Sequence, residues 1–189
     1  MQSMPLQLEF IIFLKMDFSK GFNVQLATLF GIGRIPGGGT WASLIVLLIA
    51  LFEQNAETAS FLAFFTLIIG PGAYKKLTAL FESEDPKEYV LDEVIGMGIA
   101  ISGVYIFTSI FDQLSFNLIE SLSATSELFI LTFIVFRFFD ISKIGPVGWV
   151  ESNPKEKAYN RVIGDDIMAA LLSIIVVIIF LSVNLCVMQ

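Results

Sequence analysis

Acidic side chains gather at three places in the sequence, each beside an apolar stretch. Asp92 and Glu93 precede one stretch, Asp140 follows another, and Asp165 and Asp166 precede a third. A helix dipole stabilises an acid at its N-terminus by about 0.3–1 kcal/mol, which is enough to explain one such pair. Three groups of ionisable residues at the ends of apolar stretches are better explained by function, because charges at membrane depth are costly.

These five carboxylates would repel one another strongly if the fold brought them together without a cation. Mg²⁺ is the natural candidate, because it prefers oxygen ligands and usually shares its coordination shell with a substrate phosphate. The sequence therefore predicts a Mg²⁺ site where the acids meet.

Two basic residues lie at helical spacing on either side of Asp140. Arg137, Asp140 and Lys143 are three residues apart, so they would share one face of a continuing helix. The planar fork of an arginine suits phosphate oxygens. The alternative for Arg137 is that its long side chain extends to the membrane interface.

A glycine-rich segment, residues 31–43, runs into the first long apolar stretch. Backbone N–H groups exposed at a helix N-terminus form an anion site, so this segment is a candidate for binding phosphate. It is not a Walker A sequence. A simpler interpretation is a turn in which Thr40 or Ser43 caps the helix.

The composition places these residues in a membrane protein. Apolar residues make up 56% of the chain and charged residues 15%, with a mean hydropathy of +0.80, whereas an average soluble domain has about 25% charged residues. The chain has no histidine, which excludes histidine-dependent catalysis, and its one cysteine, Cys186, cannot form an intramolecular disulfide. The net charge of −7 comes without a basic stripe, so we expect no nucleic-acid partner. No obligate protein partner is evident either.

Five apolar stretches predict an all-α, polytopic integral membrane helical bundle, forming a single domain over residues 1–189. A spanning helix needs about 20 residues, and the first stretch is short enough to be a tilted or re-entrant segment. Residues 6–14 form an earlier apolar run interrupted by Glu9, which we interpret as an interfacial helix rather than a signal peptide. The five stretches are Thr40–Phe52, Ala59–Tyr74, Val94–Phe111, Leu128–Phe139 and Ile167–Met188.

The positions of the eleven lysine and arginine residues predict the orientation. They precede the first stretch, follow the second and surround the loop after the fourth, whereas residues 53–58 and 112–127 contain none. Basic residues accumulate in short cytoplasmic loops. We therefore expect a multi-pass protein whose N-terminus and acidic clusters lie on the cytoplasmic side.

Four segments, in order along the chain, resemble the phosphatidylglycerophosphatase A family of bacterial membrane lipid phosphatases. They contain the glycine-rich loop, an Asp-Glu pair, a Phe-Arg-x-x-Asp-x-x-Lys motif and an Asp-Asp pair, and they are residues 31–43, 89–96, 136–143 and 164–169. The family uses Mg²⁺ to hydrolyse the phosphate monoester of phosphatidylglycerophosphate, giving phosphatidylglycerol and inorganic phosphate. The resemblance implies the same reaction here, on a lipid substrate in the bacterial inner membrane.

The resemblance also implies a role for each matched side chain. The candidate metal ligands are Asp92, Glu93, Asp140, Asp165 and Asp166, of which Glu93, Asp140 and Asp166 are also candidate catalytic acids. The candidate phosphate-binding residues are Gly39, Thr40, Ser43, Arg137 and Lys143. Family members usually have glycines at the positions of Asn160 and Arg161, a difference that bears on substrate fit more than on the reaction class.

Two functional alternatives belong to other classes. Carboxylates within a membrane also mark ion paths, which admits a divalent-cation carrier or channel. A catalytically inactive lipid-binding protein is the other. For a phosphatase, the sequence leaves open whether the nucleophile is water or an aspartate.

Overall fold

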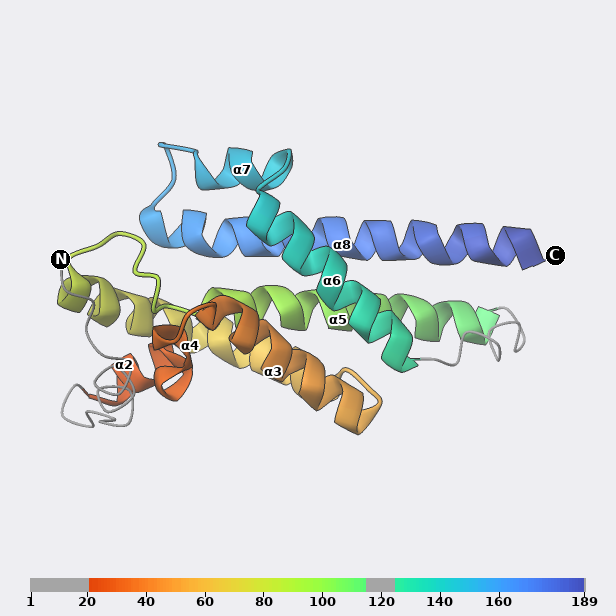
Figure 1. Cartoon of the computed structure of the whole chain (residues 1–189), viewed down its shortest axis with the longest axis horizontal. Helices are drawn as coiled ribbons and strands as arrows, with labels where there is room; N and C mark the ends of the chain where they lie inside the picture. The colour runs from red at the N-terminus through yellow and green to blue at the C-terminus, as the bar shows by residue number, and fades with distance from the viewer. Residues whose placement is uncertain (1–20, 115–124, 189) are drawn as a thin grey trace, which may run out of the picture.

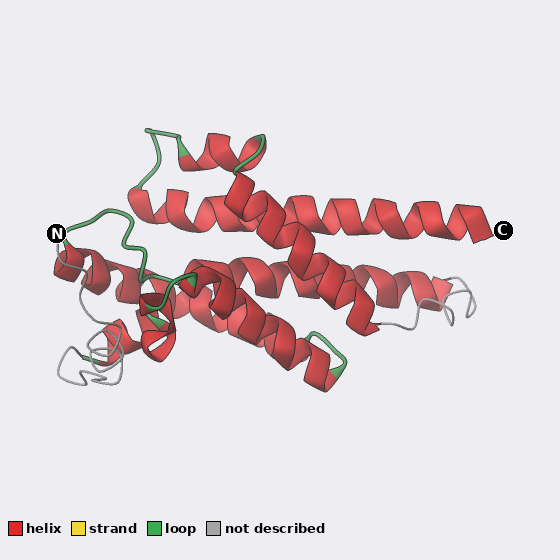
Figure 2. Ribbon diagram, in the orientation of Figure 1, coloured by secondary structure: helices red, strands yellow, loops and turns green. Residues whose placement is uncertain are grey.

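A computed structural model describes residues 21–114 and 125–188, and every regular element within them is a helix (Figure 2). The all-helical prediction is confirmed for this part of the chain. The predicted interfacial helix at residues 6–14 lies outside the described residues. The elements are α2 (Phe22–Ala27), the 3₁₀ helix η2 (Leu29–Arg34), α3 (Gly38–Glu53), α4 (Glu57–Phe81), α5 (Leu91–Leu114), α6 (Thr125–Ser142), α7 (Pro146–Glu151) and α8 (Ala158–Met188).

Helix ends coincide with residues in the left-handed backbone region. Gln54 ends α3 with φ 56°, and Glu82 ends α4 with φ 51°. After α6, Lys143 has φ 51° and Gly145 has φ 64°, and then Pro146 opens α7. Proline suits the first turn of a helix because the N–H that it lacks would have no helical partner there. This short reversal turns the chain back before α8 begins.

The long helices alternate in direction. In Figure 1, α3, α5 and α8 run from the left-hand end of the bundle to the right, while α4 and α6 return. The left-hand end therefore holds the starts of α3, α5 and α8, the ends of α4 and α6, and the short helix α7. This topology brings the four motif-bearing segments to one end, although they are far apart in the sequence.

Glycines on α5 let neighbouring helices approach closely. A Cβ atom at Gly98 would lie 2.7 Å from the carbonyl oxygen of Ala59 on α4, and one at Gly96 would lie 2.9 Å from the Phe136 ring on α6. Both distances are shorter than van der Waals contact, so a side chain at either position would push the helices apart. Small residues are the usual means of close packing between membrane helices.

Within residues 21–114 and 125–188, two helices are long and apolar enough to cross a membrane, at Leu91–Ile110 and Ala158–Asn184. The helix α3 is apolar but has only 16 residues. A polytopic arrangement with five segments thus stays a prediction, because α4 contains Pro71 and several polar residues and α6 carries charges near both ends.

Large apolar side chains are exposed along several helices. Examples on α4 are Phe61 and Ile68, and on α8 Ile175 and Ile179, each with more than half of its surface exposed. Soluble monomers rarely expose extended apolar surfaces, and such surfaces mark contact with a membrane or a protein.

Candidate active site

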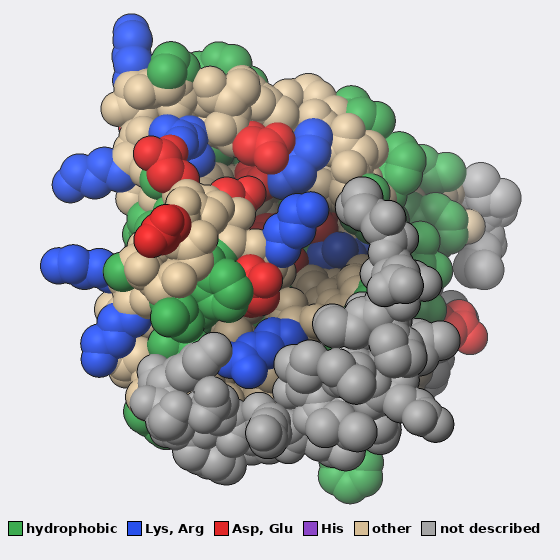
Figure 3. All heavy atoms as spheres, turned by 60° about the vertical axis from the view of Figure 1, so that its left-hand side comes forward, with side chains coloured by type: hydrophobic (Ala, Val, Ile, Leu, Met, Phe, Trp, Pro, Cys, Tyr) green, Lys and Arg blue, Asp and Glu red, His purple; other side chains and the backbone are tan. Residues whose placement is uncertain are grey.

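Charged side chains surround a hollow at the end of the bundle where the motifs meet (Figure 3). The pocket there has a volume of about 400 Å³. Its lining includes all five predicted metal-ligating acids together with Lys143, namely Asp92, Glu93, Asp140, Lys143, Asp165 and Asp166. The structure therefore brings these six side chains into one cavity.

Three of the acids form a compact group, which we call the carboxylate triad. Asp92, Glu93 and Asp166 each offer an oxygen, and these oxygens lie within 4.8 Å of one another. Asp92 and Asp166 are buried, with 8% and 3% of their surfaces exposed. Within the described residues, Glu93 Oε2 and Asp166 Oδ1 are buried without a hydrogen-bond partner. Buried polar atoms are normally paired, and three carboxylates this close together could hold a divalent cation.

The helix dipole does not explain both acidic pairs. Asp92 and Glu93 lie in the first turn of α5, as the sequence predicted. Asp165 and Asp166, however, do not open their helix, because α8 begins at Ala158 and its first turn has no acid. The apolar stretch predicted to begin directly after them is instead part of a longer helix, because the residues before it extend α8 by about two turns. A dipole reaches only the first turn, so Asp166 needs another stabilising partner.

Two glycines allow the triad to assemble. A Cβ atom at Gly39, in the first turn of α3, would overlap the Oε1 atom of Glu93. A Cβ atom at Gly96 would lie 3.0 Å from the Cβ of Asp166, between α5 and α8. That Gly39 binds phosphate through its backbone stays a prediction; in the structure its missing side chain makes room for the Glu93 carboxylate.

Arg137 ties the glycine-rich segment to Asp140. One terminal nitrogen lies 2.6 Å from Asp140 Oδ2 and 3.4 Å from Ser43 Oγ, and the other donates to Thr40 Oγ1 at 3.1 Å. The Arg137 side chain is only 13% exposed, so most of its surface is covered by other parts of the protein. These contacts make Arg137, Thr40 and Ser43 a single network beside the pocket.

Lys143 lies in the pocket itself. It forms an ion pair with Asp165, and its Nζ is 3.7 Å from Glu151 Oε1 and 4.0 Å from Asp140 Oδ1. Burial favours the neutral amine, but the hydrogen bond and charge of Asp165 outweigh it and raise the pKa of Lys143 above its ordinary value. Lys143 therefore stays cationic at neutral pH. Asp140 and Asp165 thus have cationic partners, whereas no ion pair among the described residues involves Asp92, Glu93 or Asp166.

The sequence was compared with models of known protein families. The family model described as Phosphatidylglycerophosphatase A matches residues 25–181. The chain belongs to the phosphatidylglycerophosphatase A family. No curated protein and no solved structure matches it.

The family match covers every predicted site residue, from Gly39 to Asp166. Membership of the phosphatidylglycerophosphatase A family indicates a phosphatase of phospholipid metabolism associated with a membrane. The two apolar helices are compatible with that location.

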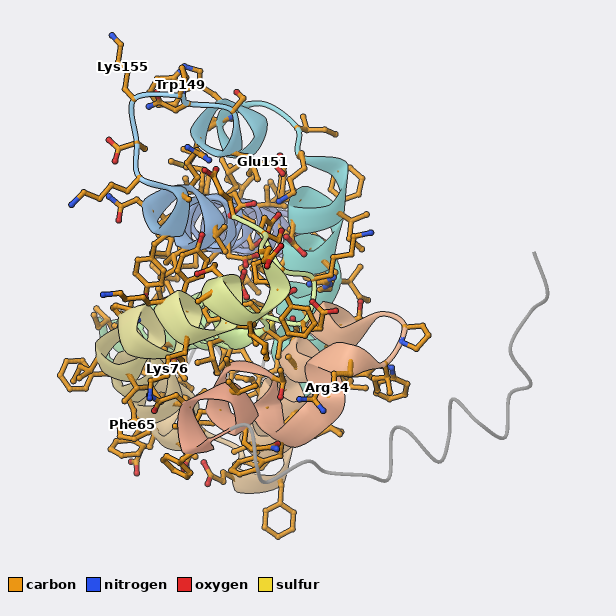
Figure 4. All side chains as sticks on the ribbon, turned by 90° about the vertical axis from the view of Figure 1, so that its left-hand side faces the viewer. Arg34, Phe65, Lys76, Trp149, Glu151 and Lys155 are labelled. Carbon is orange, nitrogen blue, oxygen red and sulfur yellow. The ribbon has the colours of Figure 1, made fainter. Side chains whose placement is uncertain are left out.

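The pocket also contains residues that sequence reasoning did not assign to the site. They come from the loop between α4 and α5, from α7 and from the first turn of α8, and include Glu84, Lys87, Tyr89, Glu151 and Arg161. Figure 4 looks onto this end of the bundle and labels Glu151 on α7. Only Arg161 had a usable signal, because it lies one helical turn before Asp165.

Proposed function

We propose that this chain hydrolyses the terminal phosphate monoester of phosphatidylglycerophosphate to give phosphatidylglycerol and inorganic phosphate, with Mg²⁺ bound by Asp92, Glu93 and Asp166. The carboxylate triad carries this proposal: three acids within 4.8 Å, two of their oxygens buried without partners, in a member of a lipid phosphatase family.

The triad suits Mg²⁺ for physical reasons. Three carboxylates so close together repel one another, and their oxygens are the ligands that Mg²⁺ prefers. Mg²⁺ usually takes one or two carboxylates together with substrate phosphate, and the adjoining pocket has room for that phosphate. When bound, the ion would neutralise the triad and polarise the phosphate.

The side chains around the triad would hold and orient the substrate. Lys143 is a cation inside the pocket, fixed by Asp165, and can donate to a phosphoryl oxygen as negative charge develops there. Arg137 fixes the carboxylate of Asp140 through a close ion pair. The fixed Asp140 carboxylate would either orient an attacking water or attack the phosphorus atom directly.

The distribution of charge argues against a cation carrier. Beyond Glu93 the candidate span of α5 has no charged residue up to Ile110, and beyond Asp166 that of α8 has none up to Asn184. In these two helices the carboxylates thus occupy one end only. Charged residues along the path across the membrane are typical of a carrier or channel, and these two candidate spans have none beyond Glu93 and Asp166.

Removal of divalent cations is the first test. We expect purified protein in mixed detergent–lipid micelles to release phosphate from phosphatidylglycerophosphate, a chelator to abolish the release, and added Mg²⁺ to restore it. The measurement is colorimetric phosphate release with phosphatidylglycerol quantified in parallel. Undiminished turnover in the chelator would overturn the assignment of the triad to a metal, and absence of turnover with Mg²⁺ would overturn the proposed reaction.

The end of the bundle that holds the pocket is proposed to face the cytoplasm. Nine of the eleven basic residues are described, and all belong to segments at this end: η2, the C-terminal part of α4 and its loop, the end of α6, and the loop and first turn before the α8 acids. Basic residues favour the cytoplasmic side. Exposed apolar side chains on the helices would face lipid in a multi-pass bacterial inner membrane.

Single cysteines in a Cys186→Ser background test this orientation. We expect a cysteine at Asn55, between α3 and α4, to react with a membrane-impermeant thiol reagent in intact cells. Cysteines at Ser83 and Ser152, at the opposite end, should react only after the membrane is permeabilised. Labelling of Ser152→Cys in intact cells would place the pocket on the outer face.

A further inference from the structure

A second charged group lies in the pocket at a distance from the triad, and the proposed reaction leaves it without a role. Arg161, in the first turn of α8, pairs with Glu84 in the loop after α4: Arg161 Nη2 lies 3.1 Å from Glu84 Oε2. Both residues line the pocket, and so does the exposed Lys87. The Arg161 side chain is 25% exposed and that of Glu84 is 81% exposed, so the pair lies where the pocket meets solvent.

Helix geometry fixes the position of Arg161 relative to the catalytic end of the pocket. Arg161 and Asp165 are four residues apart on α8, so they lie on the same helical face, about 6 Å apart along the axis. Asp165 in turn pairs with Lys143. Arg161 is therefore one helical turn farther out than the residues that would surround the reacting phosphate.

The charges in the pocket limit where an anionic ligand can bind. Its lining contains eight acids but only three bases, which are Lys87, Lys143 and Arg161. Lys143 is already surrounded by Asp140, Glu151 and Asp165. A second negative charge on the substrate, about one helical turn from the first, would meet Arg161 and Lys87.

The arginine is anchored in a way that leaves its binding edge available. Its Nη1 donates to the backbone oxygen of Glu156 at 3.0 Å, which fixes the guanidinium to the loop just before α8. The Nη2 contact is with the Glu84 carboxylate, which is largely exposed, and exposed ion pairs of this kind are weak. An arginine has five N–H donors, so these two contacts do not exhaust it.

We propose that Arg161, assisted by Lys87, binds the second phosphate of the substrate, the diester that joins the headgroup glycerol to the lipid, and that Glu84 occupies this position when no substrate is present. The assignment rests on the proposed function, because phosphatidylglycerophosphate carries a monoester and a diester separated by a three-carbon glycerol bridge. Arg161 thereby selects substrates by the phosphate that does not react.

The alternative, which we call the clasp, is a purely structural role in which the Arg161–Glu84 ion pair only holds the α4–α5 loop against α8. The two accounts predict different effects of a Glu84 substitution on diester binding. If the pair only holds the loop against α8, replacing either residue should weaken diester binding equally. If Glu84 competes with the diester, replacing Glu84 strengthens diester binding while replacing Arg161 weakens it.

Two soluble inhibitors separate the two phosphate positions. Glycerophosphoglycerol keeps the diester and has no monoester, whereas inorganic phosphate represents only the reacting group. Inhibition constants of both are measured against hydrolysis of phosphatidylglycerophosphate by wild type, Arg161→Gln and Glu84→Gln. Lys155→Gln is the matched control, because it removes the same charge from the preceding loop at a residue that extends away from the bundle (Figure 4).

For Arg161→Gln we expect the inhibition constant of glycerophosphoglycerol to rise about tenfold, the effect of losing one hydrogen bond to a charged group. Glu84→Gln should lower it severalfold, and neither variant should change that of inorganic phosphate by more than about twofold. Equal weakening by both variants would show a clasp and overturn the proposal, as would an unchanged constant in Arg161→Gln. Failure of the wild type to hydrolyse the lipid would instead overturn the proposed function, and this assignment with it.

Discussion

Replacing Asp166 with asparagine is expected to reduce phosphate release to below about one-hundredth of the wild-type rate. Substituting a residue that merely supports a metal ligand typically costs about 10–100-fold in affinity or activity, and a direct ligand should cost more. Glu93→Gln is expected to behave in the same way, since Glu93 faces Asp166 across the carboxylate triad. The measurement is the initial rate of phosphate release at saturating lipid over a range of Mg²⁺ concentrations.

Thermal unfolding distinguishes this loss from misfolding. In the wild type, Mg²⁺ should raise the melting temperature, because a ligand that binds only the folded state stabilises it. In Asp166→Asn the Mg²⁺ effect should vanish, while the metal-free protein should be at least as stable as metal-free wild type, because one of three mutually repelling carboxylates has been neutralised. Asp85→Asn, at an exposed acid lining the same pocket outside the triad, is the matched control and should keep both activity and the Mg²⁺ effect. Activity near the wild-type level in Asp166→Asn would show that Asp166 is not a metal ligand.

The sequence predicted which acids would gather because the apolar stretches determine helix ends and the number of reversals between them. Asp92 and Glu93 lie in the first turn of α5, just before the apolar stretch that the sequence showed. Grouping at one end then followed from the alternating direction of the helices, as Figure 1 shows. Those are consequences of hydrophobic pattern and chain length, which a single sequence contains.

Sequence spacing could not predict which acids pair with basic residues and which come together as the triad. Asp140 pairs with Arg137, and Asp165 pairs with Lys143, so only three of the five carboxylates come together as a triad. Partner choice depends on distances between helices that are far apart in sequence. Those distances depend in turn on where a missing side chain allows close approach, as at Gly39 and Gly96.

The two shortest helices after α2 could not be predicted from the apolar pattern either. The helix η2 and the helix α7 have six residues each, too few for a periodic signal. The sequence placed Lys143 on a continuing helix, but α6 ends at Ser142 and Lys143 adopts a left-handed backbone. That reversal points its side chain to Glu151 on α7 as well as to Asp140 and Asp165.

Loss of the cation at Lys143 is expected to impair turnover while sparing metal binding. Lys143 lines the pocket but does not belong to the carboxylate triad. Lys143→Met should lower kcat about 10²–10³-fold, the usual cost of removing one positioned donor to a developing charge. The Mg²⁺ concentration for half-maximal activity should stay close to that of wild type. Lys76→Met, which removes a lysine from the surface of α4, is the control and should leave both quantities unchanged.

Arg137 extends the same test to a residue beside the pocket. Its guanidinium contacts Asp140, Thr40 and Ser43 at once, through two nitrogens held in a plane. A lysine ammonium cannot reproduce that fork. Arg137→Lys should therefore be nearly as inactive as Arg137→Met. The Mg²⁺ concentration for half-maximal activity should again stay unchanged. If the side chain were needed only as a charge near the membrane surface, Arg137→Lys would keep nearly full activity.

Near-normal turnover in Arg137→Lys would thus show that the contacts to Thr40 and Ser43 are dispensable. Near-normal turnover in both Arg137→Met and Lys143→Met would leave the reacting phosphate without a cationic ligand from the protein, and the phosphate site would have to be sought elsewhere in the pocket.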